Sequence, residues 1–495
     1  MKLSKVIDSI PVKAVTGDLE VEISGVFFDS RKVAAGGLFC ALVGQGVDGS
    51  EFIEAAVDQG AVAVISSEPY RAEFPAVWIE VENPRQVMGI AASNFEGHPS
   101  NEMPVVGVTG TNGKTTTTFL IHHLLKAALH RAGLVGTIHY DAGAGLEDAP
   151  HTTPESPDLQ RLIREMVDND CRGVAMEVSS HGLSQSRVAG VAFDVGVFTN
   201  LSQDHLDYHG TMESYFEAKQ LLFEQMDNNR SKSGVALINT DDSFGARLYK
   251  RKFSTLKMVS YGRSVGVDYQ ISNLKSDVNG TEFKLAVAER QFLVRIPLIG
   301  SFNVYNAVAA IASAHQMGLN LRETVANMAS SPQVPGRLEA VGDRQINYRV
   351  FVDYAHTPDA LANVLETLKA LEPARIITVF GCGGDRDVTK RAPMAFAAEQ
   401  GSDLCVLTSD NPRTEDPQGI LSDAEEGFRG QGYEVIEDRR LAIKRAIMLA
   451  EERDIVLIAG KGHESYQEIH GVRHDFDDRR VAASWIRQRA EGGGS

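Results

Sequence analysis

Short runs of apolar residues recur along most of the chain and are separated by longer stretches in which polar and apolar residues mix. Between residues 105 and about 330 the two kinds of segment alternate, which predicts strands followed by helices. Strands are expected over 105–108, 173–178, 192–199 and 235–239, and helices over 114–129, 213–226 and 303–317. Strands that alternate with helices favour a parallel sheet with helical crossovers.

The segment 268–299 has a different pattern. Its apolar and polar residues alternate with a period of two, which is typical of half-buried strands. Asn279 and Gly280 form the dipeptide most characteristic of a tight hairpin turn. We therefore expect an antiparallel insertion in the parallel domain.

Two polar or proline-rich segments divide the chain. Residues 1–100 contain short strands and turns with a helix near 51–60, and the sequence NFEGHPSNEMP separates them from the central part of the chain. The sequence SPQVPGR at 331–337 is predicted to be a hinge. After it we expect strands over 348–353, 375–380, 404–408 and 454–459, and helices over 358–370, 391–400 and 440–451.

The pattern predicts an α/β protein of three domains, with boundaries near residues 100 and 335. The first domain, 1–101, is a small α/β domain. The second, 102–334, has a parallel sheet with the antiparallel insertion, and the third, 335–495, has another parallel sheet. A chain of 495 residues is long enough for several sizeable cores.

Composition narrows the function. The formal net charge of −17 makes a nucleic acid or an anionic membrane surface an improbable partner. The four cysteines are scattered, so we expect buried thiols rather than a zinc site or disulfides: Cys40, Cys171, Cys382 and Cys405. The chain starts without the apolar stretch of a signal peptide, and no run is long enough to span a membrane, so a cytoplasmic location is expected. The terminal EGGGS is expected to be either a disordered tail or a non-native addition.

The sequence PVVGVTGTNGKTTTTF at 104–119 indicates a phosphate loop. An apolar run leads into a glycine-bracketed turn, and Lys114 and Thr115 follow at the predicted helix start. Backbone N–H groups and the helix dipole favour an anion at such a place, and the hydroxyl can reach Mg²⁺. Val108 stands where the usual pattern has glycine, so the loop is a variant. The phosphate tail of ATP is the expected ligand.

Nine motifs follow one another in a characteristic order. They are TGTNGKTT (109–116), EVSSHGL (177–183), TNLSQDHLDYHG (199–210), YFEAKQLL (215–222), GSFNVYNAVAA (300–310), DYAHTPDAL (353–361), GCGGDRD (381–387), DNPR (410–413) and GKGHE (460–464). The set resembles the Mur ligases of peptidoglycan synthesis, over nearly the whole chain. It is most similar to members that join meso-diaminopimelate to UDP-N-acetylmuramoyl-L-alanyl-D-glutamate.

The resemblance implies an ATP-dependent carbon–nitrogen ligase that works through an acyl phosphate. It implies an N-terminal domain for the uridine nucleotide, a central ATPase and a Rossmann-like C-terminal domain for the amino acid. A carboxylate must approach a polyanion in this reaction, so cations must offset the repulsion. Mg²⁺ is the implied cofactor, and we expect a monomer.

By the same resemblance, the catalytic residues are Lys114, Glu177, His205 and Lys219, and Mg²⁺ is held by Thr115, Glu177, His205 and a carbamylated Lys219. The implied ATP contacts are Gly110, Thr111, Asn112, Gly113, Lys114, Thr115, Thr116, Asn303, Arg337 and Asp353. Taken alone, Lys219 is better explained as a solvated helical lysine, and only the resemblance gives it a role in the site. His356 has either a role near the nucleotide or a structural one. Arg337, at the expected hinge, would meet ATP when the third domain closes.

The substrate contacts are also implied by the resemblance. Those of the UDP-muramoyl-dipeptide are Ser30, Thr152, Thr153, Ser179, Gln185 and Arg187, and those of diaminopimelate are Arg386, Asp410, Asn411, Pro412, Arg413, Gly460 and Glu464. Diaminopimelate carries one carboxylate more than lysine, which a planar guanidinium fork suits. The alternative for Arg386 and Arg413 is pairing with nearby surface acids.

Rival functions remain open at this point. They are a lysine-adding Mur ligase, a ligase resembling folylpolyglutamate synthase, and a nucleotide-driven switch or scaffold without turnover. The switch predicts ATP binding without amino-acid-dependent phosphate release.

Overall fold

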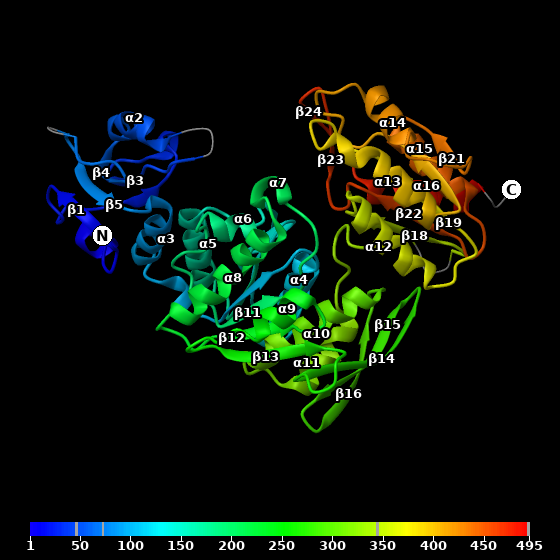
Figure 1. The fold of residues 1–495 in the computed structure, drawn as a ribbon, viewed down its shortest axis with the longest axis horizontal. Coiled ribbons are helices and arrows are strands. Elements are labelled where there is room, and N and C mark those ends of the chain that lie inside the picture. Colours follow the sequence, from blue (N-terminus) through cyan, green and yellow to red (C-terminus); the bar gives the residue numbers. More distant parts are fainter. Residues whose placement is uncertain (45–47, 72–73, 343–345, 493–495) are drawn as a thin grey trace. The chain divides into compact units, whose positions relative to one another are not determined.

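A computed structural model describes residues 1–44, 48–71, 74–342 and 346–492 (Figure 1). The chain divides into two compact units, and each is described by itself. The first contains Met1–Ser272, Lys284–Val294 and Tyr305–Met328. The second contains Asn273–Phe283, Arg295–Val304 and Ala329–Ser495, of which 493–495 lie outside the described residues together with the end of the expected tail.

The N-terminal sheet has five strands in the order β1-β5-β4-β3-β2. Its elements are α1 (Leu3–Val6), β1 (Val12–Thr16), β2 (Gly25–Phe27), η1 (Ser30–Lys32), β3 (Gly37–Cys40), η2 (Gly49–Phe52), α2 (Ile53–Asp58), β4 (Ala61–Ser66), β5 (Val77–Val81), α3 (Pro84–Phe95) and η3 (Pro99–Asn101). Only β1 pairs antiparallel, with β5. Helix α2 confirms the helix expected near 51–60.

The central sheet has eleven strands in the order β16-β15-β14-β13-β12-β11-β6-β10-β7-β8-β9. They are β6 (Val105–Thr109), β7 (Gly133–Val135), β8 (His139–Asp141), β9 (Leu146–Asp148), β10 (Val174–Glu177), β11 (Val195–Phe198), β12 (Val235–Asn239), β13 (Lys257–Gly262), β14 (Tyr269–Asp277), β15 (Gly280–Val287) and β16 (Arg290–Ile296). The strands from β7 through β10, β6, β11 and β12 to β13 are parallel, as predicted.

Helices follow these strands. They are α4 (Lys114–Leu129), α5 (Ser156–Asp168), α6 (Ser180–Ser184), α7 (Leu206–His209), α8 (Met212–Asn228), α9 (Ser243–Tyr249), α10 (Ser301–Gln316), α11 (Leu321–Asn327) and η4 (Met328–Ser330). Every residue of β6 is buried, as a central parallel strand requires. Helix α3 packs against α5, so the N-terminal sheet and the central sheet belong to one unit.

The predicted insertion consists of β14, β15 and β16, joined by two-residue turns. Neighbouring strands joined so tightly must be antiparallel. The first turn includes Asn279, and Gly280 opens β15 with a φ of 152°. The sequence did not indicate that β14 would pair in parallel with β13, so that the insertion extends the central sheet instead of forming a separate one.

The C-terminal sheet has six strands in the order β17-β18-β22-β19-β20-β21. The elements are β17 (Glu339–Val341), β18 (Arg349–Asp353), α12 (Pro358–Lys369), β19 (Ile376–Phe380), η5 (Val388–Lys390), α13 (Arg391–Gly401), β20 (Leu404–Leu407), α14 (Pro417–Glu425), β21 (Tyr433–Val435), α15 (Arg439–Leu449), β22 (Ile455–Ala459), β23 (Tyr466–Ile469), β24 (Val472–Asp475) and α16 (Asp478–Gly492). All strands but β17 run parallel in this sheet.

Alternate residues of β22 belong to two different cores, which explains the doubly wound architecture. Ile455 and Leu457 pack with α12, α13 and α14, whereas Val456 and Ile458 pack with α15 and α16. Helices therefore cover both faces of this sheet. The loops at the carboxyl ends of its strands are left to carry ligand-binding residues.

The four cysteines are buried free thiols, in agreement with the sequence-based expectation of burial. Among the residues that the structure describes, no helix combines the length and the apolar character needed to cross a membrane.

Candidate active site

The phosphate loop joins the buried strand β6 to the sixteen-residue helix α4, which begins at Lys114 (Figure 1). Gly110 has a φ of 148° and Gly113 a φ of 83°, values that favour glycine. A side chain on Gly110 would collide with Thr199 Oγ1, and one on Gly113 with Asn306 Oδ1. The loop thus holds its backbone at a helix start, where unsatisfied N–H groups attract an anion.

The residues that follow β11 clamp this loop. The N–H of Thr111 donates to Asn200 O at 2.9 Å, and that of Asn112 donates to Asn200 Oδ1 at 3.0 Å. Thr199 Oγ1 donates to Asn112 O at 2.7 Å. The start of the TNLSQDHLDYHG motif therefore fixes the phosphate loop, a role that the sequence analysis did not foresee.

Two lysines share one acceptor in the loop. Lys114 Nζ lies 2.9 Å from Gly110 O and 2.8 Å from Thr111 O, and Lys219 Nζ lies 2.8 Å from the same Gly110 O. Lys219 is 1% exposed, so it is not a solvated helical lysine. Burial, reinforced by the charge of Lys114, lowers the pKa of Lys219 well below 10.5. The neutral amine form of Lys219 is therefore more accessible than that of an exposed lysine.

Glu177 ends β10 directly beside the phosphate loop. Its Oε2 accepts from Thr115 Oγ1 at 3.0 Å and from Thr137 Oγ1 at 3.1 Å, and its Oε1 accepts from the N–H of Thr137 at 2.8 Å. The carboxylate is fully buried. Thr137 was not among the predicted site residues, because nothing in its local sequence distinguishes it.

His205 lies in a group of aromatic rings. It has a φ of 52°, and its ring centroid lies 4.9 Å from that of His181 and 6.1 Å from that of Tyr215. Burial, with the charges of Lys114 and Lys219, lowers the pKa of His205 against the opposing effect of Asp204. A neutral imidazole is the form that can ligate a metal.

The residues present are compatible with Mg²⁺. The Thr115 hydroxyl and the Glu177 carboxylate supply adjacent oxygen ligands, which this ion prefers, and Mg²⁺ commonly takes further ligands from water and substrate phosphates. Within the described ranges, no three His, Cys, Asp or Glu side chains are already gathered as a metal cluster. The protein therefore offers only part of a coordination shell by itself.

Most of the expected acceptor-site residues are connected to Glu177. Thr153 Oγ1 donates to Glu177 O at 3.0 Å and accepts from the N–H of Ser179 at 3.1 Å. Arg187 Nη1 donates to Thr153 O at 2.9 Å, and its Nη2 donates to Gln185 Oε1 at 2.8 Å. Thr152 joins the network separately, because its Oγ1 lies 3.1 Å from Thr137 Oγ1.

Glu155 extends this network to the N-terminal sheet. Its Oε1 lies 3.0 Å from Arg187 Nε, and its Oε2 lies 3.4 Å from Nη1 of Arg85 on α3. Neither Glu155 nor Arg85 was predicted as a site residue. Ser30 lies in η1, whose preceding Asp29 accepts from Arg31 Nε at 2.9 Å and from Arg31 Nη2 at 2.8 Å.

In the second unit, Asp353 organises the segment around the expected hinge. Its two carboxylate oxygens accept from the N–H groups of Leu338 at 2.7 Å and Ala355 at 2.8 Å. Burial raises the pKa of Asp353, whereas Arg337 opposes the shift. The guanidinium of Arg337 lies 4.9 Å from the ring centroid of Tyr354.

Two other expected nucleotide residues make local contacts in this unit. Asn303 Nδ2 donates to Ile299 O at 2.8 Å, and His356 Nδ1 lies 2.8 Å from Tyr354 O. His356 thus makes the bond of a structural residue, which was one of its two interpretations. Asn306, which the sequence analysis passed over, is the residue of this motif that contacts the phosphate loop.

Three loops at the carboxyl ends of β19, β20 and β22 are bonded together. Arg413 Nη1 donates to Gly384 O at 2.6 Å, and the N–H of Gly384 donates to Asn411 O at 2.9 Å. Asn411 Nδ2 donates to Glu464 Oε2 at 2.8 Å, and Asn411 Oδ1 accepts from Lys461 Nζ at 2.9 Å. The DNPR and GKGHE motifs therefore converge at one place.

The two arginines expected to bind the amino acid are not surface ion-pair partners. Arg386 Nη1 donates to Asp385 O at 3.3 Å, and Arg413 donates to a backbone carbonyl, and neither pairs with a carboxylate within the described part of the chain. Arg413 has a φ of 53°, which a residue with a side chain adopts at some cost. Both guanidinium groups are left able to meet an external carboxylate.

A buried ion pair supports these loops from below. Arg439 binds Asp478 bidentately at 2.8 and 2.7 Å, and both side chains are fully buried. Nη1 of Arg439 also lies 3.9 Å from Asp410 Oδ2. Lys461, whose side chain is likewise fully buried, lies 3.0 Å from Glu464 Oε2. Arg439 and Asp478 carry no local sequence signal, since they lie 39 positions apart, whereas Lys461 stands in the GKGHE motif together with Glu464.

Comparison with known families defines the class. The description "Mur ligase family, catalytic domain" matches residues 22–96, "Mur ligase middle domain" matches 108–314, and "Mur ligase, glutamate ligase domain" matches 336–462. The chain belongs to the Mur ligase family, which confirms the resemblance, and it is accordingly an ATP-dependent ligase with the three-domain fold of that family.

Individual relatives are similar over their whole length. Proteins of Geobacter metallireducens and Halalkalibacterium halodurans, both called UDP-N-acetylmuramoyl-L-alanyl-D-glutamate–2,6-diaminopimelate ligase, are each 44% identical to the chain. The alignments cover 100% of both chains for the first and 99% of both for the second. A solved structure of an enzyme with the same name has a TM-score of 0.73 and 38% identity, with 99% of each chain covered.

More distant structures share the fold alone. The MurF ligase of Thermotoga maritima, solved in complex with ADP, has a TM-score of 0.60 and 19% identity, and 96% of this chain and 99% of that chain are covered. A folylpolyglutamate synthase of Mycobacterium tuberculosis, solved with ADP and AMPPCP, has a TM-score of 0.60 and 20% identity, with 82% of this chain covered and 95% of that one.

Proposed function

We propose that this chain joins meso-2,6-diaminopimelate to UDP-N-acetylmuramoyl-L-alanyl-D-glutamate at the expense of ATP, in the synthesis of peptidoglycan precursors. The full-length similarity to ligases of that name supports the proposal. The observation that carries the choice of amino acid is the bond between Asn411 and Glu464, because it brings the DNPR loop and the GKGHE loop to one place. The cationic side chain of the first loop and the anionic side chain of the second then lie at one place. A diamino acid with both ammonium and carboxylate groups requires binding groups of both charges.

The proposed reaction has two steps. The terminal phosphoryl group of ATP passes to the substrate carboxylate and gives an acyl phosphate. The amine of diaminopimelate then attacks the carbonyl carbon, and inorganic phosphate leaves as the amide forms. The proposed ATP contacts are those of the phosphate loop, Gly110 to Thr116, with Asn303, Arg337 and Asp353. Lys114 and the loop N–H groups would offset the charge that opposes the first step.

The metal belongs to this proposal as well. Thr115, Glu177, His205 and Lys219 would hold Mg²⁺, and the adjacent hydroxyl and carboxylate of Thr115 and Glu177 support the assignment. When bound, the metal would neutralise phosphate charge during phosphoryl transfer. Glu177 is held in place for this role by its two bonds to Thr137.

Carbamylation of Lys219 gives the amine a chemical role. A neutral amine adds to CO₂, forms a nitrogen–carbon bond and releases one proton, which leaves a carbamate with a negative charge. The lowered pKa of Lys219 favours the neutral amine that this addition needs. The carbamate would supply oxygen ligands in a site where Lys114 Nζ contacts the same carbonyl oxygen, that of Gly110.

The two organic substrates are assigned to separate residue groups. Ser30, Thr152, Thr153, Ser179, Gln185 and Arg187 would hold the UDP-muramoyl-dipeptide, and the bonds that join Thr153, Ser179 and Arg187 support a common site. Arg386, Asp410, Asn411, Pro412, Arg413, Gly460 and Glu464 would hold diaminopimelate. Arg413 and Arg386 would receive its distal carboxylate, and Glu464 with Gly460 O its distal ammonium.

We also propose domain boundaries at 101/102 and 334/335, with a hinge at 331–337, and a monomer that acts in the cytoplasm. The matched family ranges, which end at residue 314 and resume at 336, support a boundary between them.

The decisive experiment measures phosphate release from ATP with Mg²⁺ and the UDP-muramoyl-dipeptide, while meso-diaminopimelate and lysine are compared. We expect turnover with diaminopimelate and a kcat/KM for lysine lower by about two orders of magnitude or more, because an unfilled guanidinium pair is costly. Equal turnover with lysine would support the lysine-adding alternative. ATP binding without amino-acid-dependent phosphate release would support the nucleotide-driven switch.

A further inference from the structure

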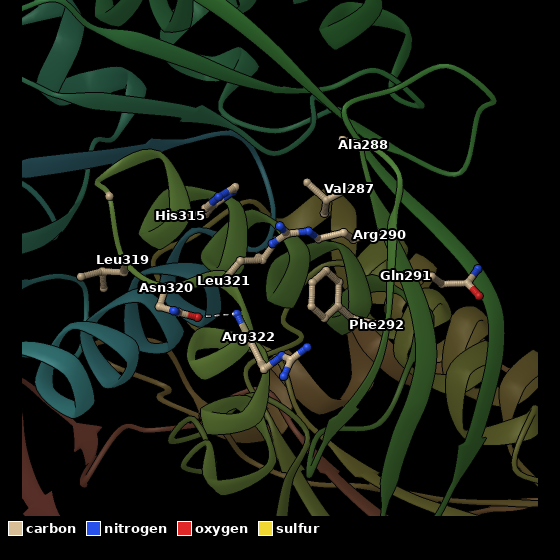
Figure 2. Close-up of a pocket in the computed structure, with 11 residues that line it drawn as sticks. Val287, Ala288, Arg290, Gln291, Phe292, His315, Leu319, Asn320, Leu321 and Arg322 are labelled. Carbon is tan, nitrogen blue, oxygen red and sulfur yellow. Dashed lines mark hydrogen bonds between the residues drawn. The ribbon is translucent and has the colours of Figure 1, made fainter.

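An open pocket of about 1080 Å³ lies between the β15–β16 hairpin and the connection from α10 to α11 (Figure 2). None of its lining residues is among those proposed to contact ATP, Mg²⁺ or the organic substrates. All of them belong to the first compact unit. The pocket is therefore a second concave feature, separate from the ligase residues described above.

The pocket exists because the hairpin extends past the helices that cover it. Successive residues of a strand point to opposite faces, so Arg290 and Phe292 share a face with the fully buried Val294. Helix α10 ends at Gln316, and beyond it a side chain on Gly318 would meet no atom within 4 Å. If α10 continued for one more turn, it would cover Phe292. Because the helix stops at Gln316, the Phe292 side chain remains partly exposed. An apolar wall is left without a covering layer.

Two arginines give this apolar pocket a positive charge. Arg290 comes from the hairpin and Arg322 from α11, and Figure 2 shows the Arg290 side chain reaching across toward His315 and Leu321. Neither forms an ion pair with any residue that the structure describes. By contrast Arg295, in the same strand as Arg290, pairs with Glu282 at 2.6 Å. Two unpaired arginines in one pocket are notable in a chain with a net charge of −17.

A chain of hydrogen bonds leads from Lys257 to His315 in the same pocket. Lys257 Nζ, which can only donate, lies 2.9 Å from Gln316 Oε1. The amide nitrogen of Gln316 therefore donates to Tyr269 OH at 2.7 Å, and Tyr269 OH lies 2.7 Å from His315 Nδ1. When the hydroxyl donates to Nδ1, the neutral ring carries its hydrogen on Nε2.

The charge state of His315 agrees with this arrangement. Burial lowers the pKa of His315, and Lys257 and Arg290 lower it further. The ring is therefore neutral at neutral pH, and it offers one N–H group. The pocket combines N–H donors from three side chains with an apolar wall, and none of its lining side chains is acidic.

The strand that forms the rim is also free on one side. β16 is the terminal strand of the eleven-stranded sheet, so one row of its backbone N–H and C=O groups faces outward. Leu293 on the opposite face of the strand is 52% exposed. A free edge of this kind accepts an additional extended segment, with pockets for alternate side chains.

We propose that this pocket and the edge of β16 form a docking site for an extended, acidic segment of a partner protein. The segment adds to β16, places an apolar side chain against Phe292 and Leu321, and pairs its carboxylates with Arg290 and Arg322. An extended segment suits the pocket better than a small anion, because the arginines come from two different elements and the adjoining strand edge is open. The complementary charge opposes the general repulsion between an acidic partner and this acidic chain.

The test uses the full chain and a fluorescently labelled octapeptide of alternating glutamate and phenylalanine. We expect saturable binding that weakens as salt is raised, with slower amide hydrogen exchange over 290–296 when the peptide is bound. The Arg290→Glu, Arg322→Glu double variant should weaken binding about tenfold or more. Amino-acid-dependent phosphate release should be unchanged, which also shows that the variant is folded.

Matched controls separate the alternatives. Arg445→Glu, on α15 in the second unit, should leave peptide binding unaltered. Octapeptides of alternating lysine and phenylalanine, or of alternating glutamate and serine, should bind at least about tenfold more weakly than the acidic apolar one. Equal binding of the serine peptide, or its full displacement by millimolar inorganic phosphate, would indicate a simple anion site and overturn the proposal. Unchanged binding by the double variant would overturn it as well.

Discussion

Lys114 and Lys219 donate to the same atom, the carbonyl oxygen of Gly110, at 2.9 and 2.8 Å. Two ammonium groups cannot share one acceptor without strong repulsion, and one of them is almost fully buried. The result is a lysine pair of unequal character, in which Lys114 carries the charge and Lys219 is driven toward the neutral amine. The first suits the phosphates of a nucleotide, and the second suits addition to CO₂.

Replacing Lys219 with alanine is expected to lower kcat/KM by about a hundredfold or more, because a ligand that offsets charge beside the phosphates is lost. Phosphate release measures the change, and added bicarbonate should not restore it. With ¹³C-labelled bicarbonate, the wild type should show a carbamate resonance that the variant lacks. Lys369→Ala, at an exposed lysine of the C-terminal domain, serves as the control. Full activity of Lys219→Ala would remove this residue from the site.

Gly113→Ala is expected to abolish measurable ATP binding, because the new methyl group would meet Asn306 Oδ1 in addition to the strain of a positive φ. Gly97→Ala is the matched control, since Gly97 has a φ of 72° and open space around it. That control should cost only about 1 kcal/mol of stability and leave ATP binding intact. Isothermal titration with ATP and Mg²⁺ distinguishes the two variants. Equal affinities would mean that the contact with Asn306 has no influence.

Glu155→Gln should raise the KM for the UDP-muramoyl-dipeptide about tenfold, because Arg187 and Arg85 lose the carboxylate that orients them. The KM for ATP should stay the same. Glu102→Gln, which breaks the exposed ion pair with Arg164, is the control and should change neither value. A parallel rise in both KM values would point to a general structural defect instead.

Arg413→Ala is expected to raise the KM for diaminopimelate about a hundredfold with a smaller effect on kcat, because the distal carboxylate loses its guanidinium partner. Arg445→Ala removes an exposed arginine that pairs with Glu434, and it should leave these kinetics unaltered. Steady-state phosphate release over a range of diaminopimelate concentrations gives both constants. If the Arg413 variant behaved like the control, this residue would not bind the amino acid.

Asp141→Asn should lower the free energy of unfolding by about 1–3 kcal/mol at pH 7. The buried carboxylate accepts from the N–H of Gly143 at 2.8 Å and lies 3.3 Å from His122 Nε2, and these contacts lower the pKa of Asp141. A carboxylate whose pKa is lowered by folding contributes its full stabilisation at pH values above its pKa in the unfolded chain, about 3.9. This contribution to the free energy of unfolding is lost as the pH falls through the pKa of the folded state. Urea unfolding at pH 7 and about pH 2.5, well below the unfolded pKa, should therefore show a smaller difference between variant and wild type at the lower pH.

Much of the fold could be predicted because local patterns encode it. Helix α4 begins and ends at the predicted residues 114 and 129, and β12 coincides with 235–239, because a phosphate loop and a buried strand have strong local signatures. The short strands β8 and β9 and the hairpin β23–β24 were not predicted. Their residues are largely exposed or mixed, and pairing with a neighbouring strand, rather than local propensity, holds them in place.

The candidate site likewise contains residues that local sequence patterns predict and residues that only the tertiary structure reveals. Lys114, Glu177 and Arg413 stand in motifs whose spacing marks them. By contrast, Thr137 is bonded to Glu177 across 40 positions, Glu155 to Arg85 across 70, and Arg439 to Asp478 across 39. No local pattern reports such a partner. Asn306 was passed over in favour of Asn303, since both lie in one motif and only packing against Gly113 tells them apart.

The sequence by itself determined the family, the order of the domains, the phosphate loop and most of the residues to be tested, since each depends on residue types at short spacing. Tertiary structure alone decided that Lys219 is buried beside Lys114, that the insertion continues the central sheet, and that an arginine-lined pocket opens beneath its outer strand. Burial, electrostatic shifts and cavities arise from chain segments that meet in space, and their energies depend on neighbours that are remote along the chain.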